Sequence, residues 1–248
     1  MMKKRWWGQS AACWITLLGI ASATQAASFS VSPVRVDLSP RQLSQALIVR
    51  NESNDKALVL QLQTVSWSQE AGKDIYLPTT ALLATPPIFT IPAGAIQVIR
   101  VASLRPPVGS EEKPFRLLLR EVPGPAKADT TGVQIALEIH LPVFLKPLVA
   151  STPDLHWRAR LEPEGRLRLS LENKGNAHVQ VANLVLTALG SAETVASETA
   201  FSYVLAQQSR DWLFKLNSAT LDEIKRGVRL KALSDSAAID IELIPESH

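Results

Sequence analysis

The chain has 248 residues, 46% of them hydrophobic, a size and composition typical of a globular protein with one large or two ordinary domains. Its 26 basic and 23 acidic residues give a formal charge of +3, but three of the bases lie in the first five residues and the rest of the chain is balanced. The basic pI therefore gives no reason to expect a nucleic-acid partner.

The first 26 residues have the layout of a secretory signal peptide. A basic start at positions 3–5 is followed by an apolar centre from Ala11 to Ile20 and then by small residues. We expect cleavage after Ala26, or alternatively after Ala23. The apolar centre is too short to span a bilayer and no later stretch is long enough, so we expect an exported protein without membrane insertion.

Beyond the leader, short runs alternate apolar and polar residues. Pro, Gly, Asn, Asp and Ser clusters separate these runs, a pattern typical of antiparallel sandwiches. Only residues 218–227 predict a short helix. We therefore predict an all-β protein. The runs are 29–38, 45–51, 57–67, 96–104, 115–122, 133–147, 155–162, 165–173, 178–189, 211–217, 228–234 and 238–243.

A domain boundary is predicted in KPLVASTPD, residues 146–154. Two prolines and small residues follow the longest run there, and a new series of strands begins after them. We expect domains at 27–147 and 148–248. Each has the size of one immunoglobulin-like β-sandwich.

The sequence lacks the motifs of common enzymes and metal sites. Its histidines do not have the spacing of metal ligands, and the only cysteine, Cys13, leaves with the leader. No G-x-S-x-G elbow, Gly-rich phosphate loop or H-E-x-x-H is present. Acidic pairs such as Glu111–Glu112 fit solvated surfaces. We expect neither an enzyme nor a bound cofactor or metal. The histidines are His140, His156, His178 and His248.

The stretch VQIALEIHLPVFLKP, residues 133–147, has the most informative pattern. Apolar residues occupy every second position from Val133 to Leu145, which predicts a strand with one fully apolar face. Such a strand is long, and Pro142 is tolerated only near a sheet edge because it lacks an N–H donor. Long apolar edge strands recruit other chains and are normally avoided. One interpretation is a core strand; the other is a strand that serves a partner's core.

Four motifs resemble those of the periplasmic pilus chaperones of chaperone–usher systems. Residues 133–147 are similar to the last strand of that family's first domain, an alternating apolar run followed by L-F, a basic residue and proline. ATPPIFTIPAGAIQVIRV (84–101) is similar to the family's T-P-P, P-G and R segment, FRLLLREVP (115–123) to its L-R-E-I-P strand, and SPVRVDLSP (32–40) to its first strand. The resemblance covers most of residues 29–147 and is fainter beyond.

The resemblance implies two immunoglobulin-like domains set at an angle, with a binding cleft between them. It also implies a periplasmic chaperone that captures pilus subunits by donor-strand complementation and delivers them to an outer-membrane usher. A subunit that lacks its last strand exposes an apolar groove between unpaired backbone groups, which a strand from another chain can fill. The donor residues so implied are Val133, Ile135, Leu137 and Ile139.

A pair of bases that holds the subunit's terminal carboxylate is implied as well. Arg35 matches the base on the family's first strand. Pro142 stands where the family has a lysine, so another base must take that part. We expect Arg100 ahead of Arg116 or Lys146, because a guanidinium binds a carboxylate in bidentate fashion.

The family further implies a charge network that fixes the angle between the domains, formed here by Glu121, Lys146 and Asp235. The connection between Glu121 and Val133 is short for the family. Together with the missing lysine, this favours the archaic branch that builds spore-coat-U-like pili.

Two other classes of exported β-sandwich are alternatives. A pilus subunit or surface adhesin usually has a disulfide and a single incomplete domain, whereas this chain has no cysteine after the leader and two sets of strands. A carbohydrate-binding or hydrolase sandwich needs an aromatic platform or paired carboxylates. The tryptophans after the leader are far apart in sequence: Trp67, Trp157 and Trp212.

Overall fold

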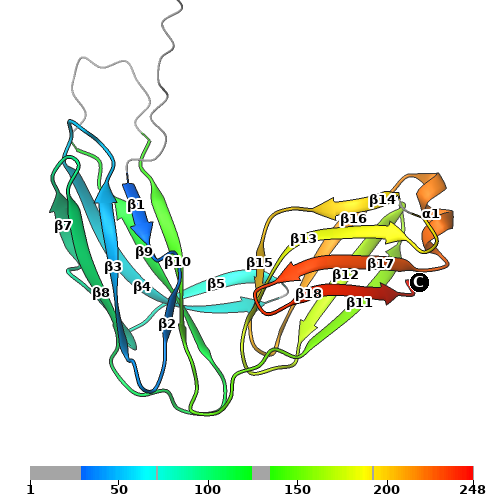
Figure 1. Ribbon diagram of the computed structural model, residues 1–248, viewed down its shortest axis with the longest axis horizontal. Coiled ribbons are helices and arrows are strands. Elements are labelled where there is room, and N and C mark those ends of the chain that lie inside the picture. Colours follow the sequence, from blue (N-terminus) through cyan, green and yellow to red (C-terminus); the bar gives the residue numbers. More distant parts are fainter. Residues whose placement is uncertain (1–28, 71, 125–134, 192, 248) are drawn as a thin grey trace, which may run out of the picture.

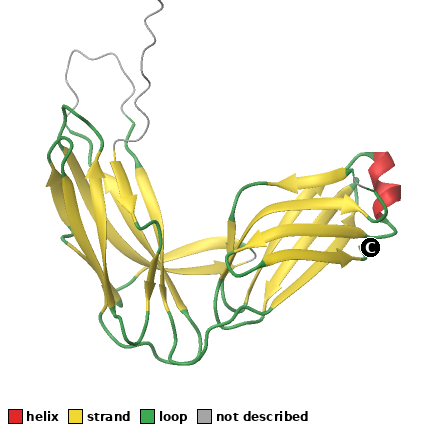
Figure 2. Ribbon diagram, viewed as in Figure 1, coloured by secondary structure: helices red, strands yellow, loops and turns green. Residues whose placement is uncertain are grey.

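The structure is a computed structural model that describes residues 29–70, 72–124, 135–191 and 193–247. These residues form two β-sandwiches that meet at one end and enclose an angle (Figure 1). Strands make up nearly all of the regular structure, and the described ranges contain one short helix, at the far end of the second sandwich (Figure 2). The predicted all-β fold of two angled sandwiches is confirmed. The proposed leader lies outside the described residues.

The first sandwich consists of two sheets around one apolar core. Leu60, Leu117 and Leu119 in its centre are fully buried. One sheet has the order β1 (Phe29–Ser32), β3 (Ser44–Asn51), β8 (Ile96–Ser103), β6 (Leu82–Thr85). The other has the order β2 (Val36–Leu38), β10 (Glu138–Leu145), β9 (Lys113–Glu121), β4 (Leu58–Glu70), β5 (Lys73–Pro78), and β7 (Ile88–Ile91) pairs with β4.

The second sandwich has the same construction. Its strand β12 alternates fully buried and half-buried side chains, which is the period that the sequence displays. One sheet has the order β16 (Gln208–Lys215), β12 (Arg166–Asn173), β11 (Leu155–Glu162), β19 (Glu246–Ser247). The other has the order β14 (Thr194–Glu198), β13 (Val179–Ala188), β17 (Val228–Ser234), β18 (Ala238–Leu243), and β15 (Ser202–Val204) pairs with β13.

The helix expected within residues 218–227 is present as α1 (Ser218–Ile224). The side chain of Asn217 accepts a hydrogen bond from the Thr220 amide and so caps its first turn. Ile224 anchors the helix in the core of the second sandwich.

In the ranges that the structure describes, no sheet mixes strands from the two halves of the chain. The last strand of the first half ends at Leu145 and the next begins at Leu155. The connecting segment coincides with the stretch in which we place the domain boundary. The long hairpin of β4 and β5 extends from the first sandwich toward the second (Figure 1).

Candidate functional site

Among the described residues, no strand pairs with one edge of β10 along its first half. It pairs with β9 over its whole length, from Glu138 to Leu145, but with β2 only from Val143 to Leu145. Pro142 is the last residue before the second pairing begins. The edge that the proline predicts therefore exists only for residues 138–142, and the remainder of β10 is an interior strand.

The apolar residues of the 133–147 stretch have three different environments. Leu141, Val143 and Leu145 are buried in the core of the first sandwich, so the prediction of one continuous apolar face available to a partner is wrong for them. Leu137 and Ile139 are partly buried and pack against the same core. The list of donors divides accordingly: Ile135 is 83% exposed, Leu137 and Ile139 are half covered, and Val133 lies outside the described residues.

An aromatic cluster fills the junction between the sandwiches. Trp67 of β4 and Phe144 of β10 meet Tyr203 of β15 and Leu205, and all four are buried. The ring centroids of Trp67 and Tyr203 are 5.5 Å apart and their planes are nearly perpendicular. This small core at the junction, separate from the cores of the two sandwiches, holds them together.

Gln69, near the tip of the β4–β5 hairpin, adds a polar link across the junction. Its amide nitrogen donates to the Tyr203 carbonyl at 3.0 Å, and its amide oxygen accepts from the Leu205 N–H at 3.0 Å. The side chain is only 3% exposed. Two buried backbone groups of the second sandwich therefore depend on one side chain of the first.

A buried contact between a carboxylate and a histidine crosses the same junction. Glu112 accepts from the backbone N–H of His178 at 3.2 Å, and its Oε1 lies 2.6 Å from the Nδ1 of the same histidine. The imidazole stacks on Phe144 with centroids 3.5 Å apart. The sequence-based view of Glu112 as a solvated acid is wrong, because its side chain is buried against His178. Their 66-residue separation leaves no local pattern that would have linked them.

Arg35 lies at this junction, in the bend before β2. Its Nε lies 3.0 Å from Asp37 Oδ2, and its Nη1 lies 3.5 Å from Asp235 Oδ2, in the β17–β18 turn of the second sandwich. Burial alone would lower the pKa of Arg35, but the carboxylates of Asp37 and Asp235 more than offset it, so the pKa is raised. The guanidinium is thus charged and oriented by one acid from each domain.

Arg116 of β9 lies close to Arg35. Its guanidinium carbon stacks 3.7 Å from the Trp67 ring and 5.6 Å from that of Tyr203. Burial raises the pKa of the Tyr203 phenol, and the positive charges of Arg35 and Arg116 oppose that rise. Both bases therefore surround one tyrosine. The Nε of Arg116 is buried and has no hydrogen-bond partner among the described residues.

Arg100 is not part of this cluster. It lies on β8, in the opposite sheet of the first sandwich, and donates to Ser44 Oγ at 3.2 Å. Its neighbours Ile99 and Val101 are fully buried. Because successive side chains point to opposite faces of a strand, Arg100 faces outward and is exposed. The expected order of the two arginines is reversed by the fold.

The expected charge network of Glu121, Lys146 and Asp235 does not form. Glu121 and Lys146 follow opposite ends of the β9–β10 pair, since Lys113 pairs with Leu145. Lys146 is level with position 112, nine residues from Glu121, so at about 3.3 Å per residue the two lie about 30 Å apart. Glu121 instead accepts a hydrogen bond from the Leu137 amide at 3.3 Å.

Asp235 of that set contacts residues of both sandwiches. Its Oδ2 is 3.5 Å from Arg35 Nη1 and 3.7 Å from His178 Nε2. The network that crosses the junction consists of these residues with Glu112, so Asp235 belongs to it and Glu121 does not.

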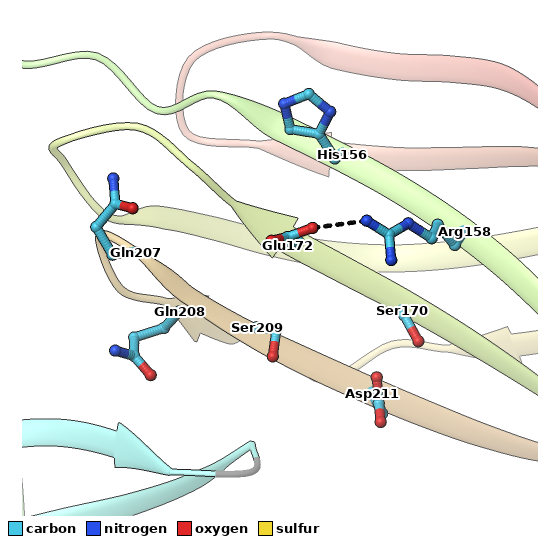
Figure 3. A pocket seen from close by; sticks show the side chains of 8 residues that line it. All are labelled: His156, Arg158, Ser170, Glu172, Gln207, Gln208, Ser209 and Asp211. Carbon is cyan, nitrogen blue, oxygen red and sulfur yellow. Dashed lines mark hydrogen bonds and ion pairs between the residues drawn. The ribbon is translucent and has the colours of Figure 1, made fainter.

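A shallow cavity of about 410 Å³ lies on the outer face of β11, β12 and β16 (Figure 3). Arg158 donates to Glu172 at 2.8 Å across it. It is open and mostly polar, and neither Arg35 nor a residue of β10 lines it. Within the described ranges, no three His, Cys, Asp or Glu side chains are grouped to hold a metal ion. The residues that line the cavity are His156, Arg158, Ser170, Glu172, Gln207, Gln208, Ser209 and Asp211.

In the part of the chain that the structure describes, no helix is long and apolar enough to cross a membrane.

Known structures with this fold include several pilus chaperones. A chain of the pre-assembly complex of chaperone CsuC with tip adhesion subunit CsuE, from archaic Csu pili of Acinetobacter baumannii, is 19% identical, with a TM-score of 0.65 over 88% of this chain and 99% of that one. A chain of the Salmonella enterica complex of pilin SafA with chaperone SafB is 16% identical, with a TM-score of 0.60 over 90% and 98%. The Escherichia coli chaperone DraB is 18% identical, with a TM-score of 0.56 over 88% and 96%.

These identities establish a shared fold. No curated protein sequence matches the chain. Residues 28–150 match the family model of the pili and flagellar-assembly chaperones, PapD N-terminal domain. The matched range includes β10, Arg35 and Arg116. Through this domain, the chain belongs to the PapD family of pili and flagellar-assembly chaperones.

Proposed function

We propose that this protein captures pilus subunits in the periplasm and holds them by strand addition at the free edge of β10 until an outer-membrane usher takes them. The observation that carries the proposal is the exposed Ile135, which continues the apolar alternation of β10 beyond the part of the strand that its own core covers. The membership of residues 28–150 in a pilus-chaperone family supports it.

The free edge supplies the main-chain part of the interaction. Between Glu138 and Pro142, β10 has no neighbouring strand among the described residues on the side away from β9. A partner strand that pairs there gains backbone hydrogen bonds irrespective of its sequence. The donor side chains, Val133, Ile135, Leu137 and Ile139, then enter the partner's groove at alternate positions. Burial of one such side chain contributes about 1.5 to 3 kcal/mol.

Arg35 and Arg116 supply the anchor for the partner's terminal carboxylate. Both guanidinium groups lie beside Tyr203, at the junction where the two sandwiches enclose their angle (Figure 1). The Nε of Arg116 is buried without a hydrogen-bond partner among the described residues, while its Nη1 donates to the His140 carbonyl at 3.5 Å. A carboxylate that binds both bases gains charge-assisted hydrogen bonds from fixed donors.

The function so proposed needs neither a cofactor nor nucleotide hydrolysis. Capture and release are exchanges of one strand for another, and the folding of the subunit drives the cycle. The likeness to the CsuC–CsuE complex and the replacement of the family's lysine by Pro142 support a place in the archaic branch.

Purification of the tagged protein from the periplasm of its native host tests the proposal. We expect small exported subunits to co-purify with it, and to be degraded or aggregated in its absence. The same fractions separate the alternative, since a pilus subunit or adhesin would be recovered in surface pili. Recovery of this chain in pili, or normal subunit levels without it, would contradict a chaperone.

A further inference from the structure

Arg35, half of the proposed anchor, already holds two carboxylates of its own chain. Asp37 comes from the same sandwich and contacts Nε at 3.0 Å. Asp235 comes from the second sandwich and contacts Nη1 at 3.5 Å. The two acids therefore use different edges of the guanidinium, and only one of them reaches it across the junction.

The contact between Asp235 and Arg35 is the one that a partner carboxylate can replace. At 3.5 Å it is the longer of the two, and 28% of the Asp235 side chain is exposed. Solvent-accessible ion pairs of this kind are weak. A partner carboxylate that binds Arg35 through its Nη groups must take the place of this acid, whereas Asp37 on Nε can stay and keep the guanidinium oriented.

A displaced Asp235 has another partner within reach. Its Oδ2 is 3.7 Å from the Nε2 of His178, a buried nitrogen with no hydrogen-bond partner among the described residues. Its Oδ1 accepts from the Gln180 N–H at 3.3 Å and holds the side chain in place. A rotation that moves Oδ2 from Arg35 toward His178 therefore leaves the carboxylate with its hydrogen bond from the Gln180 N–H.

We infer that Asp235 is an internal competitor for the partner's terminal carboxylate and sets both the affinity and the carboxylate selectivity of the anchor. In the free protein it neutralises Arg35. On capture it gives way, and the contact between the sandwiches changes with it. This inference rests on the proposed function, because it assigns the second domain a part in the same anchor.

The test compares one peptide in two forms against the full mature protein. The peptide is a synthetic strand of alternating apolar residues that ends either in a free carboxylate or in an amide. The measured quantity is the ratio of the two dissociation constants, so effects on strand pairing cancel. Asp235→Asn is the main variant, because asparagine removes the charge and keeps an oxygen for the Gln180 amide.

We expect Asp235→Asn to raise the preference for the carboxylate form by about fivefold, the size of one solvent-accessible ion pair. Asp37→Asn should lower it, because Arg35 loses the acid that orients it. Opposite signs separate competition from a general change in net charge. Asp240→Asn is the matched control: this acid pairs with Arg229 on the neighbouring strands, away from Arg35, and its removal should leave the ratio unchanged.

Two outcomes overturn the inference: one rejects the role of Asp235 alone, and the other rejects the anchor as well. If Arg35→Ala abolishes the carboxylate preference but Asp235→Asn leaves it unchanged, the competitor role is wrong while the anchor stands. If wild-type protein shows no preference and Arg35→Ala has no effect, the anchor itself fails. Should Asp235→Asn lower the melting temperature, Asp235→Ser, which also retains an oxygen for Gln180, repeats the comparison with the same expected rise.

Discussion

Replacement of Ile135 by aspartate separates capture of a partner from folding of the chaperone. The side chain is 83% exposed, so the free protein should lose no more than about 0.5 kcal/mol of stability. In a complex the same side chain becomes part of the partner's core. The loss of its burial costs about 1.5 to 3 kcal/mol, which is at least about tenfold in affinity, and a carboxylate in an apolar groove adds to the cost.

The assay combines co-purification of subunits from the periplasm with a melting curve of the purified variant. Ile244→Asp is the matched control, because Ile244 is 78% exposed and follows β18 in the second sandwich. We expect both variants to melt like the wild type and only Ile135→Asp to lose the subunits. Leu137→Asp should lose stability as well, because Leu137 packs against the core of the first sandwich.

Two results would refute this reasoning. If Ile135→Asp keeps its subunits as well as Ile244→Asp does, strand addition through this position is wrong. If Ile135→Asp unfolds the protein while the control stays folded, Ile135 belongs to the chaperone's own core.

Three further predictions concern the anchor, the junction and the energy source. Arg116→Ala should weaken subunit binding by about 2 to 5 kcal/mol and Arg100→Ala by about 1 kcal/mol or less; equal losses in a titration would contradict the anchor. Gln69→Ala should lower the free energy of unfolding by about 2 to 4 kcal/mol, because two buried backbone groups lose their hydrogen-bond partner. Gln63→Ala, at an exposed position, should leave the midpoint of urea unfolding unchanged. Transfer of a subunit to purified usher should proceed without nucleotide, since the sequence has no phosphate-binding loop; a requirement for ATP in the reconstituted reaction would argue against strand exchange alone.

Most strands of this protein could be predicted from its sequence, and the exceptions have a physical reason. Strands such as β12, with a strict period of two, were predicted because one of their faces is buried along its whole length. Strands β5, β6, β7, β14 and β15 were not predicted, as they are short and several carry no regular alternation of burial. Short strands acquire their structure from neighbours distant in the sequence.

The sequence determined the all-β class, a short helix within 218–227 and the unusual apolar alternation before Pro142. Alternation fixes which residues share a face, but it does not reveal what covers that face. Only the packing of the two sheets around one core showed that Leu141, Val143 and Leu145 are buried while Ile135 is open.

The partners of Arg35 were likewise decided by tertiary structure. Arg100 and Arg116 both lie on strands, and only the assignment of β8 and β9 to opposite sheets puts Arg116 at the junction. The acids Glu112 and Asp235 meet His178 and Arg35 across 66 and 200 residues of sequence. Charges separated so widely carry no periodic signal, because their proximity depends on how two independently folded sandwiches are set against each other.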